Sequence, residues 1–345
     1  MGLGAYVPAL LIAKALRHTG TDARVCVFES LLTAEQREQI DKTHRAYHER
    51  FDLALMGQRL AKAGSLRPQS NEPAVAALLG DWNAAFREHF IVLSGFWVPI
   101  LTRYTRRIQV DYCQLDAQEP PSWRGVAIEP DCRCIRLFDG LAGRVAYQIP
   151  RDPDGPPEVD YECRPRRIVV HGGGWGLGEY RKAAFECASS GWSVDLIVED
   201  ASEITTGATD TRFFMTSSSW RPWNHGHDGP TFPPLAELQV GQPQTHRQGS
   251  DRHELADLLC NARAVVSKPG GGTLIDSFSH CVPLVWLAPY GEHEAANAAL
   301  WQQLGFGISM QTWRESGCSA SLLALAEARL RRARAMTAFF PGVEE

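Results

Sequence analysis

Short apolar runs alternate along the chain with longer segments whose apolar residues recur every three to four positions. Runs of four to eight apolar residues predict buried strands, and the longer spacing predicts helices with one buried face. The clearest series lies in the C-terminal half. Its expected strands are 167–171, 193–199, 264–267 and 283–287, and its expected helices are 179–190, 254–261, 273–281, 292–304 and 321–339. Strands that alternate with helices predict parallel sheets covered by helices on both faces.

A second, less regular series occupies the N-terminal half. Thr33-x-x-Gln36 predicts a capping box at the start of a long helical region that ends near residue 63. Residues 213–234 are rich in Pro and Trp and show no clear period. The other expected elements are helices at 9–19 and 73–90, strands at 23–28, 90–94 and 107–115, and two short elements within 135–147.

A segment rich in Pro, Gly and Asp at 151–157 separates the two series. Such segments are typical of linkers, and 345 residues exceed what one hydrophobic core usually supports. We therefore expect an α/β protein with two Rossmann-like domains that face each other across a cleft. The expected division is 1–150, a linker at 151–160, 161–320, and a C-terminal helix at 321–345.

The N-terminus begins with a glycine-containing segment at 2–8, which we expect to be a loop that opens the first helix. In parallel α/β units such a loop normally follows a strand. Met1 stands where the loop begins. The sequence therefore predicts that the recorded chain is truncated and lacks a preceding strand.

Composition narrows the class of protein. The formal net charge of −5 gives no basic excess for nucleic acid, and we expect the arginine-rich runs at 103–107, 164–167 and 329–334 to be solvated faces. The nine cysteines are dispersed without CxxC spacing, which is typical of reduced core thiols. No apolar run reaches the roughly 18 residues of a membrane span. We expect a soluble, cytoplasmic protein with no transmembrane segment.

Two glycine-rich segments come directly after expected strands of the C-terminal half, at 171–178 (HGGGWGLG) and 268–273 (KPGGGT). Ligands of parallel sheets bind beyond the carboxyl ends of the strands. Glycine lets backbone N–H groups approach an anion, and the helix that follows adds partial positive charge. Both segments are therefore candidates to hold a diphosphate; alternatively, each is only a tight turn. Neither is a Walker A or GxGxxG sequence, so a nicotinamide cofactor is not implied.

The second glycine segment is part of a longer pattern. The pattern reads Ser267-Lys268-Pro269-Gly270-Gly271-Gly272-Thr273, Asp276, Val282-Pro283, Pro289-Tyr290-Gly291-Glu292-His293-Glu294, Asn297-Ala298 and Leu304-Gly305. About 45 residues of this pattern resemble the donor-binding half of GT-B glycosyltransferases, such as the peptidoglycan N-acetylglucosaminyltransferase, the plant galactolipid synthases and the macrolide glycosyltransferases. The resemblance implies a nucleotide diphosphate sugar as donor, with UDP as the expected nucleotide, and no obligatory cofactor. The expected donor-binding residues are Gly173, Gly174, Trp175, Lys268, Gly270, Gly271, Gly272, Thr273, Asp276, His293, Glu294 and Asn297.

Positions within this pattern differ in how well they match the family. Asp276 stands where the family has an acidic residue that binds the nucleotide ribose, and a carboxylate accepts hydrogen bonds from two hydroxyls. Alternatively, Thr273 and Asp276 form a capping box. Asn297 matches the family. His293 and Glu294 replace the Asp-Gln or Gln-Gln pair that holds the sugar, which leaves the identity of the sugar open.

On the acceptor side, Gly4, Ala5 and Tyr6 belong to a segment that resembles the family's Gly-x-Gly-His-x-x-Pro. The family's His acts as general base, and Ala5 takes its place. Displacement by a hydroxyl normally needs a base within hydrogen-bond reach. Tyr6, His225 and His227 are weak candidates, because a phenol ionises near pH 10 and the two histidines lie in a polar loop. An amine, thiol or acidic phenol would not need a strong base.

Two further patterns suggest metal sites. His44-x-x-x-His48 places two imidazoles on one helix face, but the surrounding Arg and Lys residues favour a solvated face. Asp152-x-Asp154 resembles a metal-binding DxD, but its place in the Pro-rich linker favours a turn. We expect no obligatory metal.

Together these observations predict an inverting glycosyltransferase of the hexosyltransferase type. The nucleotide sugar is expected on the C-terminal domain and a small-molecule, natural-product acceptor on the N-terminal domain, because the N-terminal half lacks an obvious basic, apolar lipid-docking helix. The resemblance also implies that the last helix packs back on the N-terminal domain. Two alternatives stay open: a nucleotide-sugar 2-epimerase of the same architecture, and a non-catalytic partner protein, which Ala5 favours.

Overall fold

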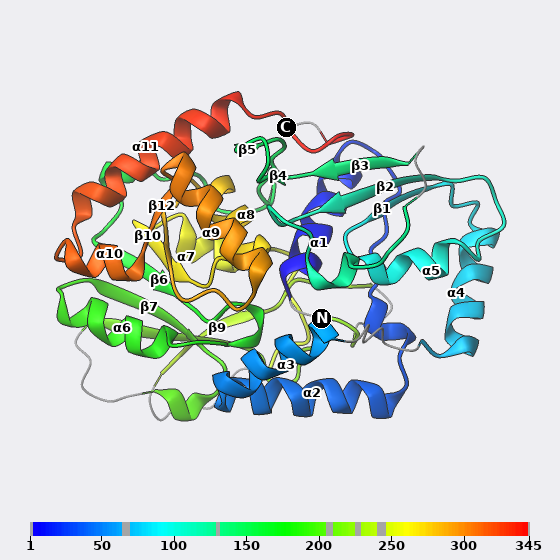
Figure 1. Cartoon of the computed structure of the whole chain (residues 1–345), viewed down its shortest axis with the longest axis horizontal. Helices are drawn as coiled ribbons and strands as arrows, with labels where there is room; N and C mark the ends of the chain where they lie inside the picture. Colours follow the sequence, from blue (N-terminus) through cyan, green and yellow to red (C-terminus); the bar gives the residue numbers. More distant parts are fainter. Residues whose placement is uncertain are drawn as a thin grey trace.

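The computed structural model describes residues 3–63, 70–128, 132–204, 210–224, 229–239 and 246–343. These residues form an α/β protein with one parallel sheet in each half of the chain, and helix α1 (Leu3–His18) lies between the two halves (Figure 1). Among the described helices, none is long and apolar enough to cross a membrane. The predicted fold class is confirmed.

The larger sheet belongs to the C-terminal half and has the strand order β12-β11-β10-β6-β7-β8-β9. Neighbours pair in parallel, except that β9 is antiparallel to β8. The four strands expected here are confirmed; β8, β9 and β12 were not predicted, because their sequences are short or lie beside the segment without a clear period. The strands are β6 (Arg167–Val170), β7 (Ser193–Val198), β8 (Thr211–Thr216), β9 (Leu235–Leu238), β10 (Ala264–Ser267), β11 (Leu284–Trp286) and β12 (Gly307–Ser309).

Five described helices of the C-terminal half follow the strands as predicted, and a sixth, α10, was not predicted. They are α6 (Tyr180–Ser189), α7 (Leu255–Leu259), α8 (Gly271–Ser279), α9 (Glu292–Leu304), α10 (Met310–Glu315) and α11 (Ala320–Met336). Helix α8 has Gly270 as its N-cap residue, in extended conformation. Thr273 therefore lies inside the first turn, and the alternative capping box of Thr273 and Asp276 is wrong.

The smaller sheet is built from three parallel strands in the order β1-β2-β3, and a two-stranded antiparallel pair, β4 and β5, follows it. These strands are β1 (His89–Val92), β2 (Gln109–Gln114), β3 (Arg133–Arg136), β4 (Phe138–Asp139) and β5 (Arg144–Val145). The predicted strand at 23–28 is wrong. Residues 21–27 have no regular structure and Phe28–Leu31 is a 3-10 helix, because an extended segment becomes a strand only where a neighbour completes its hydrogen bonds.

Five α-helices are described in the N-terminal half: α1, α2 (Ala34–Glu49), α3 (Phe51–Ala63), α4 (Glu72–Ala84) and α5 (Val98–Leu101). The capping box of α2 is confirmed, since Gln36 N donates to Thr33 Oγ1 at 3.3 Å and Thr33 N donates to Gln36 Oε1 at 2.8 Å. The helical region breaks once, at Arg50. Short 3-10 helices lie at Phe28–Leu31, Gly95–Trp97, Pro121–Trp123, Tyr161–Cys163, Gly173–Trp175 and Ala201–Glu203.

Helix α1 begins at Leu3, so the loop predicted for residues 2–8 is wrong over its described part. Packing explains the difference. Leu10, Leu11 and Ile12 of α1 are buried in one hydrophobic core with Leu274 and Ile275 of α8. This burial outweighs the low helix propensity of Gly4 and Pro8 near the start of the helix. Helix α1 is thus anchored to the C-terminal half.

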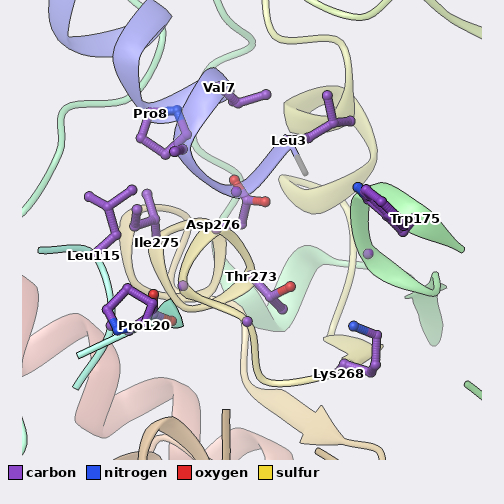
Figure 2. A pocket seen from close by; sticks show the side chains of 18 of the residues that line it. Leu3, Val7, Pro8, Leu115, Pro120, Trp175, Lys268, Thr273, Ile275 and Asp276 are labelled. Atoms are coloured by element: carbon purple, nitrogen blue, oxygen red, sulfur yellow. The ribbon is translucent and has the colours of Figure 1, made fainter. Parts of the chain in front are cut away.

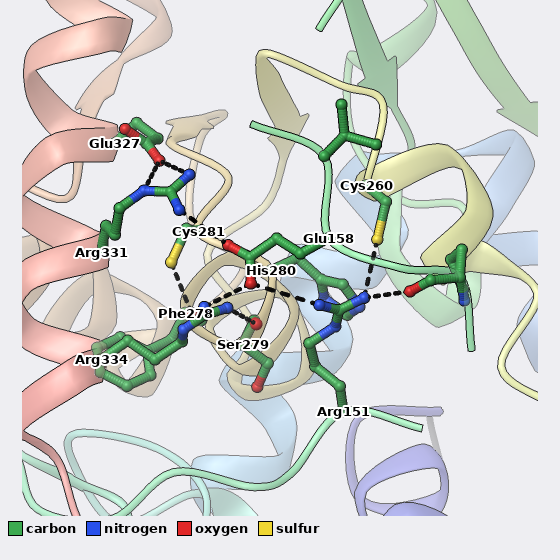
Figure 3. A network of polar contacts seen from close by, with 12 residues as sticks. Arg151, Glu158, Cys260, Phe278, Ser279, His280, Cys281, Glu327, Arg331 and Arg334 are labelled. Atoms are coloured by element: carbon green, nitrogen blue, oxygen red, sulfur yellow. Dashed lines mark hydrogen bonds and ion pairs between the residues drawn. The ribbon is translucent and has the colours of Figure 1, made fainter. Parts of the chain in front are cut away.

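A polar network ties the interdomain segment to α11 (Figure 3). Glu158 accepts hydrogen bonds from Arg334 at 2.6 Å and Arg331 at 3.3 Å, and its carboxylate lies 3.5 Å from Arg151. Arg334 also donates to Ser279 O of α8 at 2.7 Å. Helix α11 therefore contacts both Glu158 and α8.

Past α11 the chain returns to the N-terminal half. Gln148 N donates to Ala338 O at 3.0 Å, and Phe340 N donates to Gln148 O at 2.9 Å. The predicted domain division and the packing of the last helix on the N-terminal domain stay predictions.

Arg164 corrects one expectation about the basic runs. Its side chain is buried, and its guanidinium donates to the carbonyl oxygens of Val159, Ala262, His280 and Cys281. Backbone carbonyl groups, rather than solvent, therefore satisfy this cation. The solvated face predicted for 164–167 is wrong at this residue.

Candidate functional site

A cavity of about 540 Å³ lies between α1, the end of β2, and the loops that follow β6 and β10 (Figure 2). The carboxyl ends of the parallel strands meet there, as the sequence predicted. One wall is polar and comes from the two glycine segments and the start of α9. The opposite wall is apolar and comes from the N-terminal half; its residues include Leu3, Val7, Pro8, Leu115, Pro120 and Trp123.

Both glycine segments come within contact distance of α1. A Cβ atom placed on Gly174 would lie 2.8 Å from Leu3 N, and one on Gly272 would lie 3.1 Å from Gly4 Cα. Any side chain at these two positions would push α1 away. Gly174 and Gly272 are thus required for close packing of the two halves, in addition to any contact with an anion.

Lys268 places a cation beside both glycine segments. Its side chain is buried, and Nζ lies 3.1 Å from Glu294 Oε1 and 5.4 Å from the centre of the Tyr290 ring. Glu294 Oε2 also accepts a hydrogen bond from Tyr290 N at 2.6 Å. A Cβ on Gly173 would lie 3.8 Å from the same Nζ. The cation therefore faces the loop after β6 as well as its own.

His171, at the end of β6, adds a hydrogen-bond donor that the sequence analysis did not single out. Its Nδ1 accepts a hydrogen bond from Gly173 N at 3.1 Å, so the proton of the neutral ring lies on Nε2. Burial and the nearby Lys268 lower the pKa of His171 to about 4, so the ring is neutral at pH 7. Nε2 is buried and has no hydrogen-bond partner among the described residues. A ligand in the cavity could accept this hydrogen bond.

Asp276 lines the cavity from α8 and points toward α1 (Figure 2). Burial raises the pKa of its carboxyl group to about 7. Its carboxylate forms no hydrogen bond with a described residue, which leaves its oxygens available to hydroxyl donors. This geometry fits the ribose contact that the resemblance implies.

Trp175 lies at one end of the cavity, under α2. Its ring centre is 5.2 Å from that of His44 and 6.1 Å from that of Tyr47. Thr273, His293 and Glu294 line the same cavity.

Asn297 lies at a different kind of place from the other expected donor-binding residues. It is fully buried, and its side-chain amide bonds to Asp116 Oδ1 at 2.7 Å, Pro269 O at 2.9 Å and Ala117 N at 2.7 Å. Its described contacts join β2 to the second glycine segment. Its predicted contact with a donor stays a prediction.

The candidate bases are placed as follows. Ala5 lines the cavity. The Tyr6 hydroxyl donates to Thr231 O at 2.7 Å, and burial raises the pKa of Tyr6, so this phenol is less suited to accept a proton than a free one. His225 and His227 lie outside the described residues.

The predicted solvated face at His44 and His48 is wrong. His44 Nε2 lies 3.6 Å from Glu199, and His48 Nε2 lies 3.2 Å from Glu203. Glu199 follows β7 and lines the cavity, where burial raises its pKa to about 7. Both histidines thus join α2 to the C-terminal half.

The turn predicted at Asp152 and Asp154 is confirmed, and Lys14 of α1 forms ion pairs with both carboxylates, at 2.6 and 2.8 Å. Across the described ranges, no group of three or more His, Cys, Asp or Glu side chains is arranged to hold a metal ion.

Two acidic residues of the cavity, Asp116 and Glu199, were missed. Each follows a strand, at the carboxyl edge where parallel sheets bind ligands, and this position was the available signal. Both residues are separated in sequence from the glycine segments, so the sequence did not show that they line the same cavity.

Sequence comparison gives a short match. No family model matches the chain. A 68-residue segment, 20% of the chain, is 29% identical to the processive diacylglycerol beta-glucosyltransferase of Staphylococcus aureus (strain JH9). The match spans only 17% of that relative's length, and the same values hold for the protein of strain Newman.

Structural comparison covers nearly the whole chain. The spinosyn rhamnosyltransferase SpnG superposes with a TM-score of 0.54 at 11% identity, over 97% of this chain and 94% of that one. The glycosyltransferase SsfS6 of Streptomyces sp. SF2575, complexed with thymidine diphosphate, superposes with a TM-score of 0.50 at 13% identity, over 96% and 92% of the two chains. At these identities the likeness establishes the fold: the chain has the GT-B fold of glycosyltransferases.

Proposed function

We propose that this chain is a glycosyltransferase that moves a sugar from a nucleoside diphosphate to a small apolar acceptor, with inversion at the anomeric carbon. One observation carries the proposal. A single cavity between the two halves is lined by the start of α8 and the Lys268 cation on one wall and by apolar side chains of the N-terminal half on the other. This arrangement suits a donor with a diphosphate and an acceptor of low polarity.

The polar wall supplies what a diphosphate needs. The N-terminus of α8 presents backbone N–H groups and the positive end of the helix dipole. Lys268 and the Nε2–H of His171 add one positive charge and one hydrogen-bond donor on the same side. Developing negative charge on the leaving phosphate would be stabilised there.

The parts of the donor other than the diphosphate are assigned to cavity residues next to the polar wall. Asp276 accepts hydrogen bonds from the ribose hydroxyls, as the resemblance implies, and Trp175 offers a ring face at the far end of the cavity. His293 and Glu294, at the start of α9, contact the sugar. UDP is the expected nucleotide; the bound ligand of the SsfS6 structure is thymidine diphosphate.

The acceptor is assigned to the apolar wall formed by α1 and the residues after β2. Burial of an apolar acceptor there is favourable by roughly 25 cal/mol per Å² of apolar surface removed from water. One superposed structure is named a spinosyn rhamnosyltransferase, whereas the matched relative in Staphylococcus aureus is named for diacylglycerol. We favour a natural-product acceptor, since the N-terminal half lacks an obvious basic, apolar helix that would dock on a lipid.

Ala5 supports a second candidate, a non-catalytic partner protein that binds nucleotide sugars. Its methyl group lines the cavity where the resemblance places an imidazole base. Such a protein would bind the donor and leave it intact.

An assay of donor turnover separates these functions. UDP-, TDP- and GDP-sugars are incubated with the protein, with and without a mixture of phenolic and alcoholic acceptors, and nucleoside diphosphate release is measured. We expect release that rises with acceptor. Conversion of donor to a second sugar without acceptor would identify a 2-epimerase, and binding without conversion would identify the partner protein. The absence of both binding and conversion for the whole panel would overturn the proposal.

A further inference from the structure

Asp116 is a carboxylate that the N-terminal half places against the donor wall. It follows β2 and lines the cavity between the apolar residue Leu115 and the second glycine segment. A Cβ atom on Gly271 would lie 3.0 Å from Asp116 Oδ1, so the carboxylate rests on the start of α8. Asp116 therefore stands where the apolar wall meets the anion-binding wall.

Neighbouring groups hold this carboxylate in one orientation. Asn297 Nδ2 donates to Asp116 Oδ1 at 2.7 Å, and the next backbone N–H, of Ala117, donates to Asn297 Oδ1 at 2.7 Å. Asn297 is itself fixed by Pro269 O at 2.9 Å and is fully buried. A carboxylate held at one oxygen by an immobile amide presents its other oxygen in a defined direction.

The charges around Asp116 suit a proton acceptor. Burial raises the pKa of the Asp116 carboxyl group, and Glu294 raises it further, whereas His293 and the Asn297 hydrogen bond favour the ionised form. A raised pKa increases the basicity of a carboxylate, and the hydrogen bond from Asn297 favours its ionised form. No such environment surrounds Tyr6, whose hydroxyl already donates to a carbonyl oxygen.

We propose that Asp116 is the general base of the transfer, in place of the imidazole that Ala5 lacks, and that Asn297 is its positioning residue. The inference rests on the proposed function. The other three carboxylates that line the cavity are less well placed. Asp276 and Glu294 project from the donor half, and Glu294 is already paired with Lys268. Glu199 lies near His44 at the Trp175 end. Asp116 comes from the half that is assigned to the acceptor.

The proposed step balances as a single displacement. The acceptor O–H bond breaks and its proton passes to the Asp116 carboxylate. The acceptor oxygen forms a bond to the anomeric carbon, and the bond from that carbon to the phosphate oxygen breaks. The nucleoside diphosphate leaves with the bonding electron pair, and Asp116 returns its proton to water after product release.

The test compares D116N with a matched control, E119Q. The D116N amide oxygen can still accept the hydrogen bond of Asn297, whereas Glu119 is exposed and lies outside the cavity. Two acceptors are used with the preferred donor of the panel: an alcohol, which needs a base, and a thiophenol, which is ionised at neutral pH without one. Donor binding is followed by thermal shift in each variant.

For D116N we expect transfer to the alcohol to fall about 10²- to 10⁴-fold, with transfer to the thiophenol and donor stabilisation within about threefold of the wild type. E119Q should match the wild type with both acceptors. Equal losses for both acceptors, or full activity of D116N with the alcohol, would overturn the inference alone. A wild-type protein that neither binds nor converts any donor would overturn the proposed function, and the inference with it.

Discussion

The carboxyl group of Asp276 is buried in the cavity and forms no hydrogen bond with a described residue. Its pKa is about 7 in the folded protein, against an ordinary value of 3.8. Between these two values the folded protein binds a proton that the unfolded chain has lost, so stability falls as pH rises through this window. Such a loss of folding stability is expected of an ionisable group that is kept in a binding site for its ligand.

Replacing Asp276 with Asn should therefore stabilise the free protein at pH 8, on the order of 2 kcal/mol, and leave stability near pH 4 unchanged. The same variant should bind the donor at least tenfold more weakly, because it loses the charged acceptor for the ribose hydroxyls. Urea unfolding at the two pH values and a calorimetric donor titration measure the two effects. A variant that is destabilised at pH 8 would show that the carboxylate has a structural partner.

Some residues of the site were predicted from the sequence and others were missed. Lys268, Gly270 and Asp276 lie within one short motif, so the resemblance of that motif to the donor-binding half of GT-B glycosyltransferases was sufficient to predict them together. Asp116 and Glu199 follow strands of different halves. They line the same cavity because of how α1 and α2 pack against the C-terminal half. No local pattern carries that information.

At the scale of elements, the close packing of α1 requires that Gly174 and Gly272, in the two glycine segments, carry no side chain. Gly174→Ala should push the start of α1 outward, since the new methyl group would lie 2.8 Å from Leu3 N. We expect a loss of stability of about 1–3 kcal/mol and faster hydrogen exchange in the first turn of α1. Gly80→Ala is the matched control, because a Cβ there meets nothing within 4 Å inside α4; it should stabilise the protein by about 0.5–1 kcal/mol. Equal effects of the two substitutions would refute the close contact.

Helix α2 is held to the C-terminal half by an ion pair that depends on pH. The hydrogen bond to Glu203 raises the pKa of His48 above its ordinary value of 6.5. The stability that this pair contributes is therefore complete below pH 6.5 and is lost as pH rises through the folded pKa. His48→Gln should lower stability at pH 5.5 by on the order of 1 kcal/mol more than at pH 9. A pH-independent difference in urea unfolding would contradict the ion pair.

Elements were predicted best where the apolar period is long and the neighbours are local. Strands β6, β7, β10 and β11 and the helices between them satisfy that condition. The segment at 23–28 has the composition of a strand but no partner strand among the described residues. Residues 3–8 are helical although they contain one glycine and one proline. In both cases tertiary packing, which the sequence does not display, decides the outcome.

At the scale of the whole molecule, Asn297 joins the two halves through three hydrogen bonds, to Asp116, Ala117 and Pro269. Asn297→Ala should lower the free energy of unfolding by about 1–3 kcal/mol, since it leaves buried polar groups without a partner. Asn261→Ala is the control, because this exposed side chain bonds, among the described residues, to nothing but Asp257 O of the preceding helix α7. Similar losses for both variants in urea unfolding would contradict a bridging role.

The account as a whole depends on whether the cavity between the halves binds a nucleotide diphosphate sugar. A thermal-shift titration of the wild-type protein with UDP-, TDP- and GDP-sugars tests this most directly. We predict that at least one donor stabilises the protein, by about 2.7 kcal/mol at a hundred times its Kd, and that Asp276→Asn reduces the shift. A panel in which no nucleotide sugar stabilises the protein would contradict the account.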